Sequence, residues 1–175
     1  MDKLLLLNSD VILTPNWLQR LLACAKTDEN IASVNPLTNS AANIDLPMVP
    51  GTNFLSMDWI LSCRNNPSYP DVVTGVGFCI LLRRRALDKV GLFDEIYGRG
   101  YCEESDLCMR LTTQGFRTVI ADNVYVFHKG GATFKDRDKR YLKNRTIFDH
   151  RWDQEYRRQF KSFQQKGAIT NLRQQ

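Results

Sequence analysis

The amino-acid sequence predicts an α/β fold. Short apolar runs of strand length, such as residues 3–7, alternate along the chain with segments whose apolar residues recur at helical spacing, such as residues 15–26. The chain has 175 residues, 43% of them hydrophobic, and this is enough to bury one core. We therefore expect a folded domain and not a disordered chain.

The first expected elements are a strand, a helix and a second strand. Residues 3–7 form an apolar run that does not alternate, so we expect a buried, central strand with parallel neighbours. Thr14 and Pro15 suit the N-cap and first position of a helix, which we expect over residues 15–26. A short strand follows over residues 31–36.

The middle of the chain continues the alternation. The expected elements are a helix over residues 54–61, a loop over 65–71, a strand over 72–82, a helix over 83–90 capped by Gly91, and two strands over 116–120 and 124–127. The predicted strand over 72–82 carries Gly75 and Gly77. Glycines inside a strand indicate a bulge or the close approach of another group.

From Lys135 onward the chain is basic and helical in pattern, with aromatic residues placed among lysines and arginines. Such a segment is either a nucleic-acid surface or an amphipathic helix whose aromatic residues face the core of the protein. The helical recurrence of the aromatic residues favours the second interpretation. The net charge of +5 suits an anionic partner, which need not be a nucleic acid.

The cysteines and the apolar runs indicate a compartment. Five cysteines without a CxxC spacing argue against a disulfide framework and a structural zinc site, so a reducing environment is expected. No apolar run near the start has the length of a membrane span or a signal peptide. We expect a soluble protein in the cytoplasm, and contact with the inner face of the cell membrane stays open.

Three carboxylates crowd into four positions behind a glycine-bearing loop. Glu103, Glu104 and Asp106 follow Gly98 and Gly100 at the expected start of a helix. One interpretation is a charged helix N-terminus, because the helix macrodipole favours anions there. The other is a general base, because neighbouring carboxylates raise one another's pKa and so prepare a proton acceptor near neutral pH.

Two further segments place polar side chains at strand ends. Asn8 and Asp10 follow the first strand, where they either form an Asx turn or hold a hard divalent cation that bridges a diphosphate. His128 ends the last strand, as a capping residue or a metal ligand. Gly130 and Gly131 then add flexible backbone amides, which could form an oxyanion cradle.

The order of these motifs resembles the family-two nucleotide-sugar glycosyltransferases of the GT-A fold, especially bacterial rhamnosyl- and related cell-surface glycan transferases. The motifs are Asn8-Ser9-Asp10, Thr14-Pro15 before Trp17, Thr74-Gly75-Val76-Gly77-Phe78-Cys79, Val90-Gly91-Leu92-Phe93-Asp94-Glu95, the Gly98 to Arg110 stretch, and Val126-Phe127-His128-Lys129-Gly130. The resemblance covers about residues 3–134. It implies a Rossmann-like mixed sheet flanked by helices over residues 1–134, with residues 135–175 as a basic amphipathic helical extension.

The resemblance also implies a donor site. Asp10 matches the aspartate that coordinates a metal, Mg²⁺ or Mn²⁺, on the nucleotide diphosphate, and Asn8 stands where the first aspartate of that motif would be. His128 matches a histidine that completes the metal site in some relatives. Arg99 would help to offset charge on the diphosphate.

On the acceptor side, Glu103 and Glu104 match the Glu-Asp pair of the family. The second member is the usual catalytic base, so we expect Glu104 first and Glu103 second in that role, and a structural role for Asp106. The implied reaction is metal-assisted, inverting transfer of a sugar from a nucleotide-diphosphate sugar to a glycan or lipid-linked acceptor, with no nucleic acid involved.

Family members carry a first strand and helices that hold the nucleotide base before the Asn8 motif. We therefore expect this chain to lack the N-terminal nucleotide-binding portion and to need a partner chain or an oligomer. Two alternatives are a non-catalytic sugar- or nucleotide-binding fragment and a basic nucleic-acid-binding domain.

Overall fold

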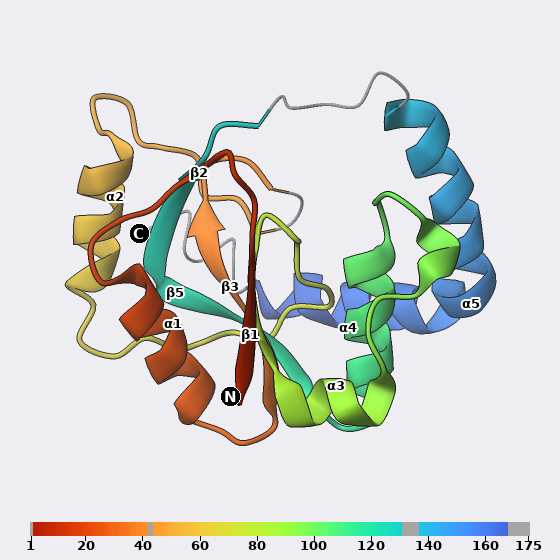
Figure 1. Cartoon of the computed structure of the whole chain (residues 1–175). Coiled ribbons are helices and arrows are strands. Elements are labelled where there is room, and N and C mark those ends of the chain that lie inside the picture. The colour runs from red at the N-terminus through yellow and green to blue at the C-terminus, as the bar shows by residue number, and fades with distance from the viewer. Residues whose placement is uncertain (1, 42–43, 131–136, 168–175) are drawn as a thin grey trace.

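The computed structural model describes residues 2–41, 44–130 and 137–167, which form a sheet with helices on both faces (Figure 1). The strands are β1 (Lys3–Leu7), β2 (Val11–Ile12), β3 (Ile31–Thr38), β4 (Cys79–Arg83) and β5 (Arg117–His128), in the spatial order β1-β4-β3-β5-β2. The helices are α1 (Trp17–Lys26), α2 (Phe54–Ser62), α3 (Arg84–Val90), α4 (Glu103–Thr113) and α5 (Arg137–Lys166), with a 3-10 turn at Glu95–Tyr97. The β3–β5 pair is parallel and the other pairs are antiparallel, so the sheet is mixed.

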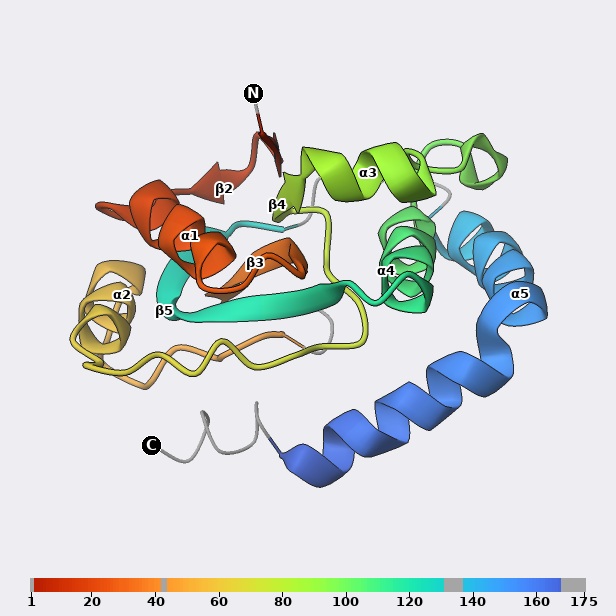
Figure 2. The ribbon, with the colours of Figure 1, turned by 90° about the horizontal axis from the view of Figure 1, so that it is seen from below.

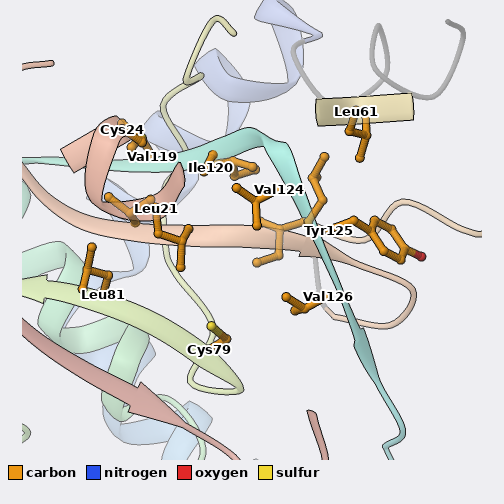
Figure 3. Close-up of a cluster of buried hydrophobic side chains, with 14 of the residues drawn as sticks. Leu21, Cys24, Leu61, Cys79, Leu81, Val119, Ile120, Val124, Tyr125 and Val126 are labelled. Atoms are coloured by element: carbon orange, nitrogen blue, oxygen red, sulfur yellow. The ribbon is translucent and has the colours of Figure 1, made fainter. Parts of the chain in front are cut away.

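Two buried clusters lie on opposite faces of the sheet. Successive side chains of a strand point to opposite faces, and β4 divides its residues accordingly. Cys79 and Leu81 pack with α1 and α2, whereas Ile80 and Leu82 pack with α3 and α4. Figure 3 shows the first cluster, and Figure 2 shows α1 and α2 on one side of the molecule with α3 and α4 on the other.

The prediction for the first strand is half right. Residues 3–7 are a strand, but β1 lies at an edge of the sheet and pairs antiparallel with β4, so it is neither central nor parallel. Leu4 is 38% exposed and Leu7 is 41% exposed. The fully buried central strand is β3, although its sequence includes polar residues. The Asn35 amide donates to the carbonyls of Val76 and Cys79, and the Thr38 hydroxyl donates to Asn39 (3.2 Å), so both find partners inside the fold.

The start of α1 differs from the prediction. The Thr14 hydroxyl donates to the backbone carbonyl of Tyr125 (2.7 Å) and so ties the segment before α1 to β5 instead of capping the helix. Asn16 takes the N-cap position in a left-handed conformation (φ 57°) and makes no side-chain cap hydrogen bond, and α1 begins at Trp17. The helices predicted over residues 54–61 and 83–90 agree with α2 and α3, and Gly91 ends α3.

The strand predicted over residues 72–82 is wrong in its first part, since only Cys79–Arg83 forms β4. The two glycines before it sit against side chains. A Cβ on Gly75 would overlap Asn35, and a Cβ on Gly77 would overlap the carboxylate of Glu104. The close-approach interpretation of these glycines is therefore confirmed, and their contacts hold the segment out of the sheet.

The two strands predicted over residues 116–127 form one strand, β5, with an irregularity in its pairing. Pro36 on β3 is opposite Ala121, but the next residue, Leu37, is opposite Tyr125. Within this irregularity the buried Asp122 accepts hydrogen bonds from the backbone and hydroxyl of Ser68 (3.1 and 2.8 Å). The polar residues between the two predicted strands thus form a bulge that anchors a neighbouring loop.

The C-terminal helix α5 begins beside α4 and continues below the sheet in the view of Figure 2. Its aromatic side chains form a third cluster with residues from α4 and the 3-10 turn; the members from α5 are Ile147, Phe148, Trp152, Tyr156, Phe160 and Phe163. The aromatic face of this helix therefore packs on the protein. Among the residues that the structure describes, no helix is long and apolar enough to cross a membrane.

Candidate active site

Asp10 and His128, which the sequence assigns to a metal site, are neighbours. The β2–β5 ladder pairs Val11 with His128, and the backbone N–H of Lys129 donates to the carbonyl of Asp10 (3.0 Å). This pairing places Asp10 Oδ2 3.3 Å from His128 Nε2. Both side chains are mostly buried, with 22% and 19% of their surfaces exposed.

Residues after β3 orient the imidazole of His128. Asn39 accepts from the backbone N–H of His128 (2.8 Å) and donates to its carbonyl (3.0 Å). His128 Nδ1 lies 3.1 Å from the carbonyl oxygen of Ser40. Because a carbonyl can only accept, Nδ1 carries the hydrogen, and a neutral ring points the lone pair of Nε2 toward the Asp10 carboxylate.

This geometry fits a divalent cation. Two acceptors facing each other across 3.3 Å need a cation or a proton between them. Adjacent ligands of an octahedral Mg²⁺ or Mn²⁺, each about 2.1 Å from the ion, are separated by about 3.0 Å. Within residues 2–41, 44–130 and 137–167, no group of three or more His, Cys, Asp or Glu side chains is arranged so that it could hold a metal ion. An ion held here would complete its shell with phosphate oxygens and water, as Mg²⁺ usually does.

Asn8 and Arg99, predicted on the donor side, are less closely involved. Asn8 is exposed, and its backbone N–H donates to the carbonyl of Phe78 (2.9 Å). Arg99 is also exposed, and its carbonyl accepts from Arg140 (3.1 Å). In the described part of the chain no hydrogen bond or ion pair joins the Arg99 side chain to Asp10. The predicted backbone cradle includes Gly131, which lies outside the described residues.

The two glutamates occupy the first turn of α4. Glu104 Oε1 accepts a hydrogen bond from the backbone N–H of Gly77 (3.0 Å). Glu103 Oε2 is buried and has no hydrogen-bond partner among the residues that the structure describes. The backbone just before them is unusual, because Tyr101 and Cys102 both have φ of +73°, a left-handed conformation that costs free energy in residues other than glycine.

The two glutamates are largely buried side by side, and this changes their acidity. Burial, and then the charge of Glu104, raise the pKa of Glu103 to about 7. Burial also raises the pKa of Glu104, although the N–H of Gly77 works in the opposite direction by stabilising the carboxylate. The pair therefore retains a proton near neutral pH, as expected for two carboxyls held side by side away from water.

One short segment joins the two halves of the site. The N–H of Gly77 binds Glu104, and the ring of the next residue, Phe78, stacks on His128 with centroids 5.2 Å apart and planes inclined by 20°. The buried Asn35 on β3 shapes this segment by donating to the carbonyls of Val76 (2.7 Å) and Cys79 (2.6 Å). Glu104 and His128 thus contact the adjacent residues Gly77 and Phe78, and Asp10 reaches this segment through its contact with His128.

Asp106 has no exposed surface. Its carboxylate accepts from the Tyr97 hydroxyl (3.2 Å), Arg110 (2.8 Å), Arg151 (3.2 Å) and the Trp152 indole (2.8 Å). It therefore links α4 to α5 and to the 3-10 turn. With all its oxygens engaged, Asp106 cannot serve as a base.

The sequence did not reveal Asn35, Asn39 or the buried Asn144 of α5. Asn35 and Asn39 act on a loop and a strand that are distant in sequence. Asn144 did leave a signal, because it is a polar residue on the aromatic side of the helix, four positions before Phe148. A polar residue on such a face has to find a partner when it is buried.

The fold is that of an α/β domain of the GT-A type, and Asp10, which follows β1, lies beside His128 at the end of β5. The chain belongs to glycosyl transferase family group 2, whose profile matches residues 4–169. The family and the fold class expected from the sequence are thereby confirmed.

A solved structure described as GalNAc-T7 with UDP, GalNAc and Mn²⁺ has a similar fold, with a TM-score of 0.58 and 16% sequence identity. The match covers 89% of this chain and 32% of GalNAc-T7, so the chain spans about a third of that protein. Comparison with curated proteins found no match.

Proposed function

We propose that this chain carries the catalytic part of an inverting, metal-assisted glycosyltransferase that moves a sugar from a nucleotide-diphosphate donor to a glycan or lipid-linked acceptor. The observation that carries the proposal is the meeting of two sites at Gly77 and Phe78. The carboxylate of Glu104, the candidate base, accepts a hydrogen bond from Gly77. The imidazole of His128, one of the two candidate cation ligands, stacks on Phe78. The family supports sugar transfer from a nucleotide-sugar donor, and the presence of UDP and Mn²⁺ in the similar structure supports a nucleotide donor held with a divalent cation.

In this mechanism Glu104 accepts the proton of the acceptor hydroxyl as that oxygen attacks the anomeric carbon. A single displacement from the face opposite the leaving diphosphate inverts the anomeric configuration. The hydrogen bond from Gly77 fixes one oxygen of Glu104, and Glu103 shares the pocket and the retained proton. A base with a raised pKa suits proton transfer near neutral pH.

Asp10 and His128 would hold the cation on the donor diphosphate. The cation would supply positive charge against the negative charge that develops on the leaving group. We also propose a cytoplasmic location, which the five free cysteines favour because a reducing compartment keeps thiols unpaired.

Calorimetric titration tests the donor site. We expect UDP, dTDP or GDP to bind in the presence of Mn²⁺ or Mg²⁺, to lose that binding in a chelator, and to lose it in Asp10→Ala. Asp88→Ala serves as a matched control, because Asp88 is exposed on the surface of α3, where it forms an ion pair with Arg84. Binding that ignores both the chelator and Asp10→Ala would contradict the donor assignment, and absence of binding would show that this chain does not form the donor site by itself.

A further inference from the structure

Asn144 of α5 makes an unusual set of contacts. Its side chain is almost completely buried, with 1% exposed. Its amide Nδ2 donates to three carbonyl oxygens, those of Tyr97 (2.7 Å), Gly100 (2.7 Å) and Tyr101 (3.1 Å). Two hydrogens therefore serve three acceptors, all within the five residues of one loop.

The loop of residues 97–101 leads directly to Glu103 and Glu104, the candidate base. Tyr101 and Cys102 adopt the left-handed conformation, and Glu103 begins α4. Such a backbone persists only where surrounding groups determine it. Gly98 and Gly100 supply no rigidity of their own. Asn144 holds the carbonyls on both sides of Gly100, and Arg140, also on α5, donates to the carbonyl of Arg99 (3.1 Å).

The docking of α5 does not depend on this contact alone. Arg151 and Trp152, two turns farther along α5, bind Asp106 on α4. The aromatic residues of α5 pack on Tyr97 and Met109. Asn144 is therefore not required merely to attach the helix, and its contacts are directed at the loop before the glutamates.

We propose that Asn144 is a positioning residue for the transfer reaction: it holds the 97–101 loop in the conformation that aims Glu103 and Glu104 at the acceptor. This inference rests on the proposed role of Glu104 as the base. It makes α5 a part of the active site through the loop that Asn144 holds.

Several charged groups surround the glutamate pair and have to be considered in any test. Cys102 is in electrostatic contact with Glu103 and Glu104 and, from α5, with Arg145 and Asp149. Arg145 and Asp149 pair with each other at 2.8 Å. A test should therefore leave both of them unchanged and alter only the amide of Asn144.

The first measurement needs no catalytic activity. In the unchanged chain the buried glutamate pair retains a proton, so the melting temperature should fall as the pH rises from 5 to 8. In Asn144→Ala the loop should relax and let water reach Glu103 and Glu104. We therefore expect the melting temperature of this variant to fall by less than half as much between pH 5 and pH 8. Trp152→Phe removes one hydrogen bond of α5 to Asp106 and serves as the matched control, with a lower melting temperature at every pH but an unchanged fall.

The second measurement is kinetic. We expect Asn144→Ala to lower kcat about 10²-fold, as misplacement of a catalytic group by about 1 Å can do, with little change in the KM for the donor. The acid limb of the kcat profile should move to lower pH. Trp152→Phe should retain kcat. Asn144→Ser, which keeps a shorter donor, should give an intermediate result and replaces Asn144→Ala if that variant does not fold.

The outcomes separate this inference from the proposed function. If Asn144→Ala and Asn144→Ser keep the full pH dependence of the melting temperature, the positioning role is overturned whether or not the chain is active. The same holds if Trp152→Phe loses that dependence equally, because Asn144 would then act only by docking α5. If the pH dependence changes as expected while no variant transfers sugar, the contact is as inferred and the proposed function fails.

Discussion

The two halves of the site are built in different ways. Asp10 and His128 lie side by side because β2 and β5 are paired antiparallel strands, so the distance between the two side chains follows from the register of the sheet. Glu103 and Glu104 stand at the end of an irregular loop, and their position depends on a helix that begins more than thirty residues later. Substitutions that disturb α5 should therefore move Glu103 and Glu104 and leave Asp10 and His128 in place.

The largest effect is expected at the base. Glu104→Gln keeps the shape of the side chain but removes its basicity, so transfer should fall about 10²- to 10⁴-fold. Metal-dependent nucleotide binding should persist, because Asp10 and His128 do not touch Glu104. Single-turnover transfer and calorimetry check the two parts. A transfer rate that is the same in Glu104→Gln as in the unchanged chain would refute the role of Glu104. A non-catalytic binding fragment would instead show no transfer in either protein.

Asp106→Asn tests the connection between α4 and α5. Asp106 is fully buried and accepts from two arginines, so removing its charge should lower the free energy of unfolding by about 3 kcal/mol. Chemical denaturation measures this loss. Asp153→Asn on the surface of α5, where Asp153 pairs with Arg157, is the control and should leave the denaturation midpoint unchanged. Equal effects of the two substitutions would contradict the linking role of Asp106.

Asn39→Ala probes the other half of the site. Loss of the two hydrogen bonds between Asn39 and the backbone of His128 should loosen the imidazole and weaken Mn²⁺ binding about 10- to 100-fold. The melting-temperature difference between pH 5 and pH 8 should stay as it is, because the glutamate pair is untouched. Titration with Mn²⁺ in the presence of nucleotide gives the affinity, and an unchanged value would show that Asn39 does not orient the ligand.

The smallest expected effect is that of Glu103→Gln on stability. The folded state raises the pKa of Glu103 from 4.5 to about 7, so it binds more protons than the unfolded state between these values, and its stability falls as the pH rises through that window. Glutamine removes this loss. After a discount for partial exposure, we expect Glu103→Gln to stabilise the protein by about 1 kcal/mol at pH 8, or about 2–4 °C in Tm, and by much less at pH 5.

Melting curves at the two pH values check this sign. Glu95→Gln, an exposed glutamate in the same loop region, is the control and should leave the melting temperature unchanged at both. A larger gain at pH 5 than at pH 8 would contradict the raised pKa of Glu103.

The family and the fold class could be predicted from the sequence, whereas the neighbours of the first strand could not. Asp10, His128 and Glu104 could be named because each follows a recognisable strand end or helix start, and the motif order carried the family. The strand neighbours could not be predicted, because the leucines of β1 report apolar character and not which strands lie beside them. A run of leucines fits an edge as well as a centre.

The contacts by which buried asparagines support the site could not be predicted from the sequence either. Asn35 and Asn144 act on backbone carbonyls, which every residue has, so their partners leave no trace in side-chain type. Gly77 was the exception. Its lack of a side chain suggested close approach, and the structure shows which group approaches.

The edge strand β1 has a consequence for handling the protein. Antiparallel pairing with β4 uses one side of β1, and along its outer side the strand presents backbone N–H and C=O groups together with the exposed Leu4 and Leu7. Such an edge is a template for strand addition, and concentrated solutions of a chain that carries one tend to self-associate. An added strand would satisfy these backbone groups and cover both leucines at once, so an edge that favours self-association is also an edge at which the sheet can be extended.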